Sequence, residues 1–231
     1  MLDISKIGAI TLDLDDTLWP VWPVIERAEI ALQHWLAKCA PRTAVLFADP
    51  HQRIQLRELA HSRLPHAHHD LSAMRLEMIR LGLEQAGEET RHAQDGFNVF
   101  FDARMQVTLF DDVLAGLERL ALRYPVLALS NGNADIHRVG IGRYFVGSVS
   151  ARDVGVGKPD PRIFHAAAAA LGVAPGQVLH VGDDAHLDVI GAMDCRMQAV
   201  WINRNDHLWT HSIPAHAEAA SMLELCDLLG A

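Results

Sequence analysis

Polar side chains able to bind phosphate or a metal follow directly after three short apolar runs of the sequence. They are Asp13 and Asp15 after the first run, Ser130 and Asn131 after the second, and Asp183 and Asp188 after the third. Carboxylates held close together repel one another, and each raises the pKa of its neighbours. A hard divalent cation offsets that repulsion, and Mg²⁺ takes carboxylate, water and phosphate oxygens as ligands. These residue types therefore predict a Mg²⁺ site, provided that the three groups meet.

The expected ligands follow from this chemistry. We expect Asp13, Asp183 and the backbone carbonyl of Asp15 to hold Mg²⁺, with Asp188 orienting the ligands or Lys158 from behind. Lys158 lies in the turn VGKPDP ahead of a helical pattern. Its ammonium group would bring a positive charge to the same place.

Four short runs rich in β-branched residues or leucine predict buried parallel strands. They cover residues 7–12, 126–129, 178–181 and 199–202, and helical patterns occupy 111–123, 161–171 and 221–229. Strands that alternate with helices predict an α/β fold with a doubly wound, mainly parallel, Rossmann-like sheet. Such sheets bind ligands beyond the carboxyl ends of their strands. The three polar groups are therefore expected in one crevice.

One long stretch interrupts this alternation, since residues 19–107 contain no convincing strand. Amphipathic helical patterns cover residues 24–40, 51–64, 70–86 and 88–105, with Pro41, Pro50, Pro65 and Gly87 between them. Four helices with short links predict a small helical bundle. We therefore expect an α/β core from residues 1–18 and 108–231, and an inserted helical domain from residues 19–107.

Composition excludes several functional classes. The 231 residues carry 20 Lys and Arg against 29 Asp and Glu, a net charge of −9 with His neutral, which argues against a nucleic-acid or anionic-membrane partner. No apolar run approaches the roughly 20 residues of a membrane span, and no secretion signal is evident. Three widely spaced cysteines fit free thiols in a reducing cytoplasm. We expect a cytoplasmic monomer or weak dimer.

Four motifs occur in the order found in the haloacid dehalogenase-like hydrolases, and the chain resembles that family over nearly its whole length. The motifs are DLDDT at 13–17, LSNGN at 129–133, GKPDPRIF at 157–164 and VGDDAHLD at 181–188. A lone motif of this kind would be weak evidence, because either acidic motif could be a helix N-cap. The inserted helical domain matches the family's helical cap in its position.

The resemblance implies a role for each of these residues. Asp13 would be the nucleophile that forms an aspartyl-phosphate, and Asp15 would protonate the leaving oxygen. Ser130, Asn131 and Lys158 would bind phosphoryl oxygens, with Lys158 and Mg²⁺ offsetting developing charge. Metal ligands would come from Asp13, Asp15, Asp183 and Asp188. The implied enzyme is a Mg²⁺-dependent phosphomonoester hydrolase acting on a small phosphorylated metabolite.

A narrower resemblance is to bacterial phosphatases of the flavin pathway, which hydrolyse 5-amino-6-(5-phosphoribitylamino)uracil and FMN. SNGNA at 130–134 and QAVWI at 198–202 carry it. Alternatives are a phosphatase of a nucleotide or sugar phosphate, a phosphomutase, a 2-haloacid dehalogenase, and a catalytically silent interaction module. Dehalogenases of the family need neither the metal nor an acid two residues after the nucleophile, so Asp15, Asp183 and Asp188 favour phosphate chemistry.

Several residues near or inside the helical insert have two interpretations each. Arg75 would contact a substrate phosphate or would be a solvated helix residue. Glu26 has the same two interpretations, and substrate contact is less favoured for it than for Arg75. Trp19 and Trp22 would stack on a flat heterocycle or pack between the domains. A local histidine-rich stretch would bind a metal or form a solvated loop. Its members are His61, His66, His68 and His69.

Overall fold

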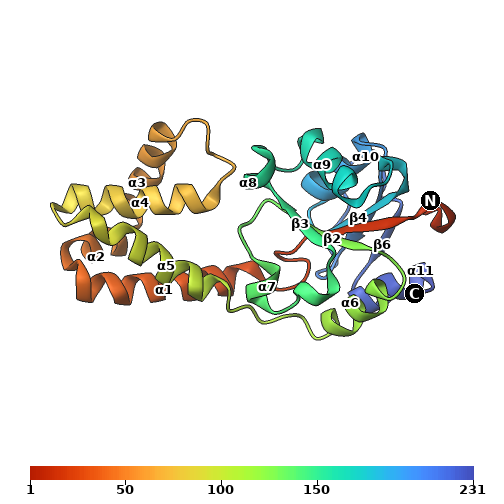
Figure 1. The fold of residues 1–231 in the computed structure, drawn as a ribbon, viewed down its shortest axis with the longest axis horizontal. Helices are drawn as coiled ribbons and strands as arrows, with labels where there is room; N and C mark the ends of the chain where they lie inside the picture. The colour runs from red at the N-terminus through yellow and green to blue at the C-terminus, as the bar shows by residue number, and fades with distance from the viewer. The chain divides into compact units, whose positions relative to one another are not determined.

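The computed structural model describes residues 1–231, which form two compact units (Figure 1). One unit contains Met1–Pro20 and Thr108–Ala231, and the other contains Val21–Val107. The sequence analysis placed the domain boundaries after residues 18 and 107. No helix combines the length and the apolar character that a membrane span requires.

The first unit is built on a six-stranded sheet in the order β3-β2-β1-β4-β5-β6, with every neighbouring pair parallel. The strands are β1 Ala9–Leu12, β2 Val126–Ser130, β3 Gly147–Ser150, β4 Val178–Gly182, β5 Gln198–Ile202 and β6 Ala217–Ala219. This confirms the predicted doubly wound α/β fold. The strand order reverses between β1 and β4, and at such a switch point the connecting loops diverge and leave a crevice for a ligand.

Helices cover both faces of the sheet, and every residue of β1, β2, β4 and β5 is therefore buried. Within this unit α9 (Pro161–Leu171) and α10 (Gly191–Asp194) lie on one face, with α6 (Val113–Ala121) and α11 (Met222–Leu229) on the other (Figure 1). The short helices α7 (Ile136–Val139) and α8 (Ala151–Val154) complete the unit. Helix α9 begins with Pro161 in its first turn and ends at Gly172, where φ is +68°, as the sequence predicted.

Two strands were not predicted, β3 and β6, and both lie at the edges of the sheet. Strand β3 has no buried residue and β6 has one, and neither has an apolar run, because an edge strand has one hydrogen-bonded neighbour and a partly open face. Their conformation depends on pairing with β2 and β5 rather than on their own composition.

The second unit contains five α-helices and no strand. They are α1 Val21–Cys39, α2 Pro41–Ala48, α3 Pro50–Arg63, α4 Leu71–Ala86 and α5 Ala93–Arg104, with a 3₁₀ turn at Thr90–His92. Four helices were predicted, and α2 was missed. Pro41 and Pro50 were interpreted as breaks, but each lies in the first turn of a helix, where proline's missing N–H has no intrahelical partner to lose.

A core of aliphatic side chains, with Phe47 and Phe100, holds these helices together. The approach of α4 to α2 is especially close at Gly82. A Cβ atom there would lie 2.5 Å from a ring carbon of Phe47, so only glycine allows this packing. The unit therefore has a hydrophobic core of its own.

Candidate active site

A tight turn after β1 brings a hydroxyl group back to the first aspartate. Asp16 has a φ of +60°, a left-handed conformation that a short polar residue tolerates, and the Leu18 N–H donates to the Leu14 carbonyl at 2.8 Å. The Thr17 hydroxyl then lies 2.9 Å from Asp183 Oδ1 and 3.3 Å from Asp13 Oδ2. Thr17 therefore joins the loop after β1 to the loop after β4.

The Lys158 ammonium group lies at the centre of the site and is buried. Its Nζ is 2.5 Å from Asp13 Oδ1, 2.5 Å from Asp188 Oδ1 and 3.0 Å from the Leu129 carbonyl. All three ammonium donors thus have an oxygen acceptor, which a desolvated cation requires. The structure brings together Asp13, Lys158, Asp183 and Asp188 from the ends of separate strands and one loop, as the sequence suggested.

His180 supports Asp188 from inside the sheet, and the sequence analysis missed it. Its Nε2 lies 3.0 Å from Asp188 Oδ1, and its Nδ1 lies 2.9 Å from the Thr11 hydroxyl on the neighbouring strand. Burial lowers the pKa of His180, which favours the neutral imidazole with one N–H donor and one acceptor. A histidine in the middle of an apolar strand was the available signal.

The carboxylates of Asp13, Asp183 and Asp188 offer oxygens within 4.8 Å of one another. Burial raises the pKa of Asp183 to about 7, and the nearby Asp188 carboxylate adds to the effect. Burial also raises the pKa of Asp13 well above its usual value. The pKa of Asp188 is lowered instead, because Lys158 and His180 outweigh the effect of its burial.

This donor set fits Mg²⁺. If all three carboxylates are ionised, the one ammonium group leaves two negative charges uncompensated, and a divalent cation would neutralise them. Asp188 already accepts hydrogen bonds on both oxygens, from Lys158 and His180 on Oδ1 and from the Asp184 N–H on Oδ2. Asp13 and Asp183 are thus the side chains better suited to hold a cation, with hard oxygen ligands of the kind that Mg²⁺ prefers.

Asp15 has a partner that was not predicted. The Trp19 indole Nε1 donates to Asp15 Oδ1 at 2.8 Å, and Trp19 is fully buried. Stacking of Trp19 on a substrate ring is therefore wrong, because its ring is fully buried. The indole instead fixes the direction of the Asp15 carboxylate.

Ser130 and Asn131, at the end of β2, make different contacts. The Ser130 hydroxyl oxygen accepts the Gly132 N–H at 2.9 Å, and its own O–H can donate. The Asn131 amide accepts the Lys158 N–H at 2.6 Å and donates to the Lys158 carbonyl at 2.9 Å. Asn131 therefore holds the turn that carries Lys158, and its contact with substrate stays a prediction.

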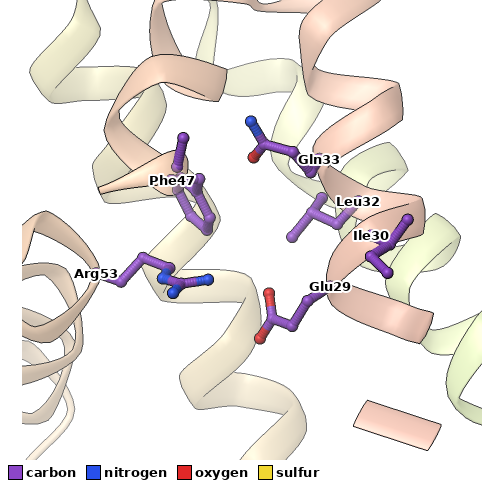
Figure 2. A pocket seen from close by; sticks show the side chains of 7 residues that line it. Glu29, Ile30, Leu32, Gln33, Phe47 and Arg53 are labelled. Atoms are coloured by element: carbon purple, nitrogen blue, oxygen red, sulfur yellow. The ribbon is translucent and has the colours of Figure 1, made fainter. Parts of the chain in front are cut away.

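The helical unit contains a cavity of about 180 Å³ between α1, α2 and α3 (Figure 2). Leu32 and Phe47 line its apolar side, while the side chains of Glu29 and Arg53 point toward one another (Figure 2). A larger cavity of about 630 Å³ shares Glu29 and Arg53, and extends over Ile25 and the 76% exposed Trp22.

Arg75 lines the larger cavity but already has a counter-ion. A terminal guanidinium nitrogen lies 2.6 Å from Glu29 Oε1, and the group lies 4.2 Å from the centre of the Phe100 ring. Arg53 and Arg57, one helical turn apart on α3, line the same cavity without an ion pair. They were missed, although their spacing of four residues places them on one face of a helix.

The histidine-rich stretch and the cysteines show no catalytic arrangement. His61 and His68 are stacked with 4.9 Å between ring centres, at the end of α3 and in the loop that follows. Metal binding there stays a prediction. All three cysteines are free thiols.

Comparison with known proteins gives consistent results. Residues 7–195 match the family model for haloacid dehalogenase-like hydrolases. The chain is 31% identical to the 5-amino-6-(5-phospho-D-ribitylamino)uracil phosphatase YigB of Escherichia coli K12, over 98% of both chains. It is 30% identical to a phosphoserine phosphatase of Thermus thermophilus, over 95% of both chains.

A similar solved structure has a different description. It is a 2-haloacid dehalogenase of Pseudomonas syringae pv. Tomato DC3000, with 35% identity and a TM-score of 0.92, covering 97% of this chain and 98% of that one.

Proposed function

Since this chain belongs to the haloacid dehalogenase-like hydrolases and is a phosphatase, we propose that it is a Mg²⁺-dependent phosphomonoesterase that acts through an aspartyl-phosphate. One observation carries this proposal. The carboxylates of Asp13 and Asp183 converge around the Thr17 hydroxyl, with the Lys158 ammonium group on Asp13. Such a cluster suits a divalent cation and a phosphoryl group better than any neutral ligand.

Asp13 makes the first bond. Lys158 holds its Oδ1, which directs the other oxygen toward phosphorus. As the bond between this carboxylate oxygen and phosphorus forms, the bond from phosphorus to the leaving oxygen breaks. Asp15, held by Trp19, gives its proton to that leaving oxygen. Ser130 donates to a phosphoryl oxygen. The Lys158 ammonium group, whose donors stay on Asp13, Asp188 and the Leu129 carbonyl, and a bound Mg²⁺ would offset the charge that develops there.

Water completes the cycle. It attacks phosphorus of the aspartyl-phosphate while Asp15 accepts one of its protons, and the bond from phosphorus to the Asp13 oxygen breaks. Inorganic phosphate leaves and the Asp13 carboxylate is restored. Asn131 and Asp188 hold Lys158 in place through both steps.

The substrate that we propose is a small phosphorylated metabolite with a heterocyclic ring, of the flavin-pathway type. The similarity to the uracil-derivative phosphatase over nearly the full chain supports this class. We further propose that the helical unit acts as the cap that selects the substrate, since Trp22 and two arginines without ion pairs line its larger cavity. Its location in the cytoplasm and its state as a monomer or weak dimer stay predictions.

A panel of phosphomonoesters tests the proposal. It contains 5-amino-6-(5-phosphoribitylamino)uracil, FMN, phosphoserine, a nucleotide and a sugar phosphate, each assayed for phosphate release with Mg²⁺ and with EDTA. We expect Mg²⁺-dependent release, with the highest kcat/KM on the uracil derivative or FMN. A preference for phosphoserine or a sugar phosphate would overturn the substrate class while leaving the phosphatase mechanism intact.

A 2-haloacid dehalogenase is the second candidate, because a structure so described has the TM-score of 0.92. In that reaction Asp13 would displace a halide from carbon, and no metal is needed. The Asp183 carboxylate and the Asp15 side chain would then have no evident use. Chloride release from 2-chloropropionate in the presence of EDTA, without phosphate release from any ester, would establish this candidate instead.

A further inference from the structure

Two residues that follow one another closely at the end of β5 hold both loops of the metal site. We propose that Trp201 and Arg204 are positioning residues that set the separation of Asp13 and Asp183, and with it the affinity for Mg²⁺. Neither residue belongs to the four motifs, and neither touches the carboxylates themselves. The inference rests on the proposed Mg²⁺ site and adds two residues that determine its geometry.

Trp201 holds the loop after β4. It lies opposite Gly182 in the parallel pairing of β4 with β5, so its indole can reach the next residue along. The indole Nε1 donates to the Asp183 carbonyl at 2.6 Å, and the side chain is 4% exposed. Trp209 packs edge-on against it with 5.2 Å between ring centres, which fixes the plane of the indole.

Arg204 holds the loop after β1. Its Nε donates to the Thr17 carbonyl at 3.1 Å, and its two terminal nitrogens bind the two oxygens of Asp112 at 2.9 and 3.0 Å. The guanidinium lies 4.1 Å from the centre of the Phe110 ring, and Asp112 also accepts the Met222 N–H at 2.6 Å. A bidentate pair of this kind has one defined orientation, so the Thr17 backbone is fixed.

The contacts of Trp201 and Arg204 both act on the separation of Asp13 and Asp183. Thr17 bridges Asp13 and Asp183 through its hydroxyl, and Arg204 fixes Thr17 while Trp201 fixes Asp183. Between them Asn203 is tied to β6, since its N–H donates to the Ala219 carbonyl at 2.9 Å. Residues 201–204 therefore connect both loops rigidly to the sheet edge. Loss of such supporting contacts typically lowers metal affinity about 10-fold to 100-fold.

Trp201→Phe and Arg204→Lys test this role. Trp201→Phe keeps an aromatic ring and removes the N–H donor. Arg204→Lys keeps the positive charge and removes the planar set of guanidinium N–H donors. Mg²⁺ is titrated while the unfolding temperature is recorded, which reports binding without turnover. We expect each variant to need about tenfold more Mg²⁺ for its half-maximal shift, and kcat to return at saturating Mg²⁺ to within about twofold of the unchanged protein.

Matched controls separate positioning from general destabilisation. Trp35→Phe alters an indole that packs against the core of the helical unit, and Arg119→Lys alters an arginine that binds Asp227 and the Ala231 carbonyl. Both should keep the original Mg²⁺ midpoint. Trp201→Met, whose side chain has no hydrogen-bond donor, replaces Trp201→Phe if that variant does not fold.

Two results would overturn the proposal while the unchanged protein still responds to Mg²⁺. One is an unaltered Mg²⁺ midpoint in the Trp201 and Arg204 variants, and the other is an equal loss in the two controls. If the unchanged protein shows no Mg²⁺-dependent shift at all, the metal site itself fails, and this inference fails with it.

Discussion

Lys158 is the side chain that links the carboxylates of the candidate site. It lies between Asp13 and Asp188, and each of its donors reaches an oxygen. The two carboxylates nevertheless differ, since the pKa of Asp188 is lowered and that of Asp13 is raised by burial. Asp188 thus stays ionised and supports the lysine. Asp13 keeps an oxygen for chemistry for a geometric reason, since its Oδ2 has only the Thr17 hydroxyl near it, at 3.3 Å.

Asp13→Asn tests the nucleophile. The amide cannot attack phosphorus at a useful rate, so we expect kcat to fall at least about 10³-fold with Mg²⁺ present. The unfolding temperature should change little, because Asp188 and the Leu129 carbonyl still accept from Lys158. Steady-state phosphate release and a thermal unfolding curve on the same preparation measure both. Retained turnover would remove Asp13 from its assigned role.

Residue types predicted the residues that meet in the candidate site but not their supports. Asp13, Asp183, Asp188 and Lys158 were found because they follow strands or a turn in recognisable motifs. The contacts of His180 with Asp188 and of Trp19 with Asp15 depend on neighbouring strands and on the turn after β1. Spacing along the chain carries no information about such contacts, so they required coordinates.

At the scale of elements, helices α6 and α11 pack against each other through a close contact at Gly116. A Cβ atom at this position would lie 2.5 Å from Met222 Cβ and 3.2 Å from its backbone carbon. The obstacle includes backbone, which cannot move as a flexible side chain does. The glycine therefore sets the distance between the two helices.

Gly116→Ala should destabilise the protein despite alanine's better helix propensity. Overpacking against backbone typically costs about 1–3 kcal/mol, which exceeds the gain of about 1 kcal/mol from propensity. Urea unfolding measures the difference in the free energy of unfolding. Ala115→Ser, on the exposed face of the same helix, serves as the control and should stay within about 0.5 kcal/mol. A stabilised Gly116→Ala variant would contradict the close contact.

Helix α3 gives a test of the cap. Arg53 and Arg57 line the larger cavity without ion pairs, whereas Arg75 is neutralised by Glu29. Replacing both Arg53 and Arg57 by methionine should raise KM about tenfold for the preferred metabolite, because a charge-assisted hydrogen bond is lost. The kcat for p-nitrophenyl phosphate should not change.

Arg63→Met is the matched control, on the same helix but outside the cavity and paired with Glu84. An unchanged KM in the Arg53 and Arg57 double variant, or an equal rise in the control, would show that this cavity does not select the substrate.

The elements were predicted best where burial imposes a pattern. Central strands β1, β2, β4 and β5 appear as apolar runs because helices cover both faces. Edge strands β3 and β6 lack that pattern. Helix α2 was missed because proline both ends and begins helices, and only the following amphipathic turns distinguish the two cases.

For the molecule as a whole, acid stability has an identifiable contributor. Burial raises the pKa of Asp112, but the Arg204 guanidinium and the Met222 N–H lower it further, so its folded-state pKa is below 3.8. A carboxylate with a depressed pKa stabilises the fold above its unfolded pKa, and this contribution is lost as pH falls through the folded value. Asp112 therefore stabilises the protein above about pH 5 and loses this effect below about pH 4.

Asp112→Asn should lower the free energy of unfolding by about 1.5–3 kcal/mol at neutral pH. The difference in the free energy of unfolding between the variant and the unchanged protein should become smaller below about pH 4, because the unchanged protein then loses the same interaction. Urea unfolding at several pH values measures this difference. A difference that stays constant from neutral pH to pH 3 would contradict the assigned pair.

The central claim concerns the whole enzyme, and the mass of the peptide that carries Asp13 tests it most directly. Protein is mixed with a phosphomonoester and Mg²⁺, quenched with acid during turnover and digested. We predict that part of this peptide is heavier by one phosphoryl group at Asp13, and that EDTA or Asp13→Asn removes the heavier form. Phosphate release without any phosphoryl group on Asp13, or with the group on another residue, would contradict the account.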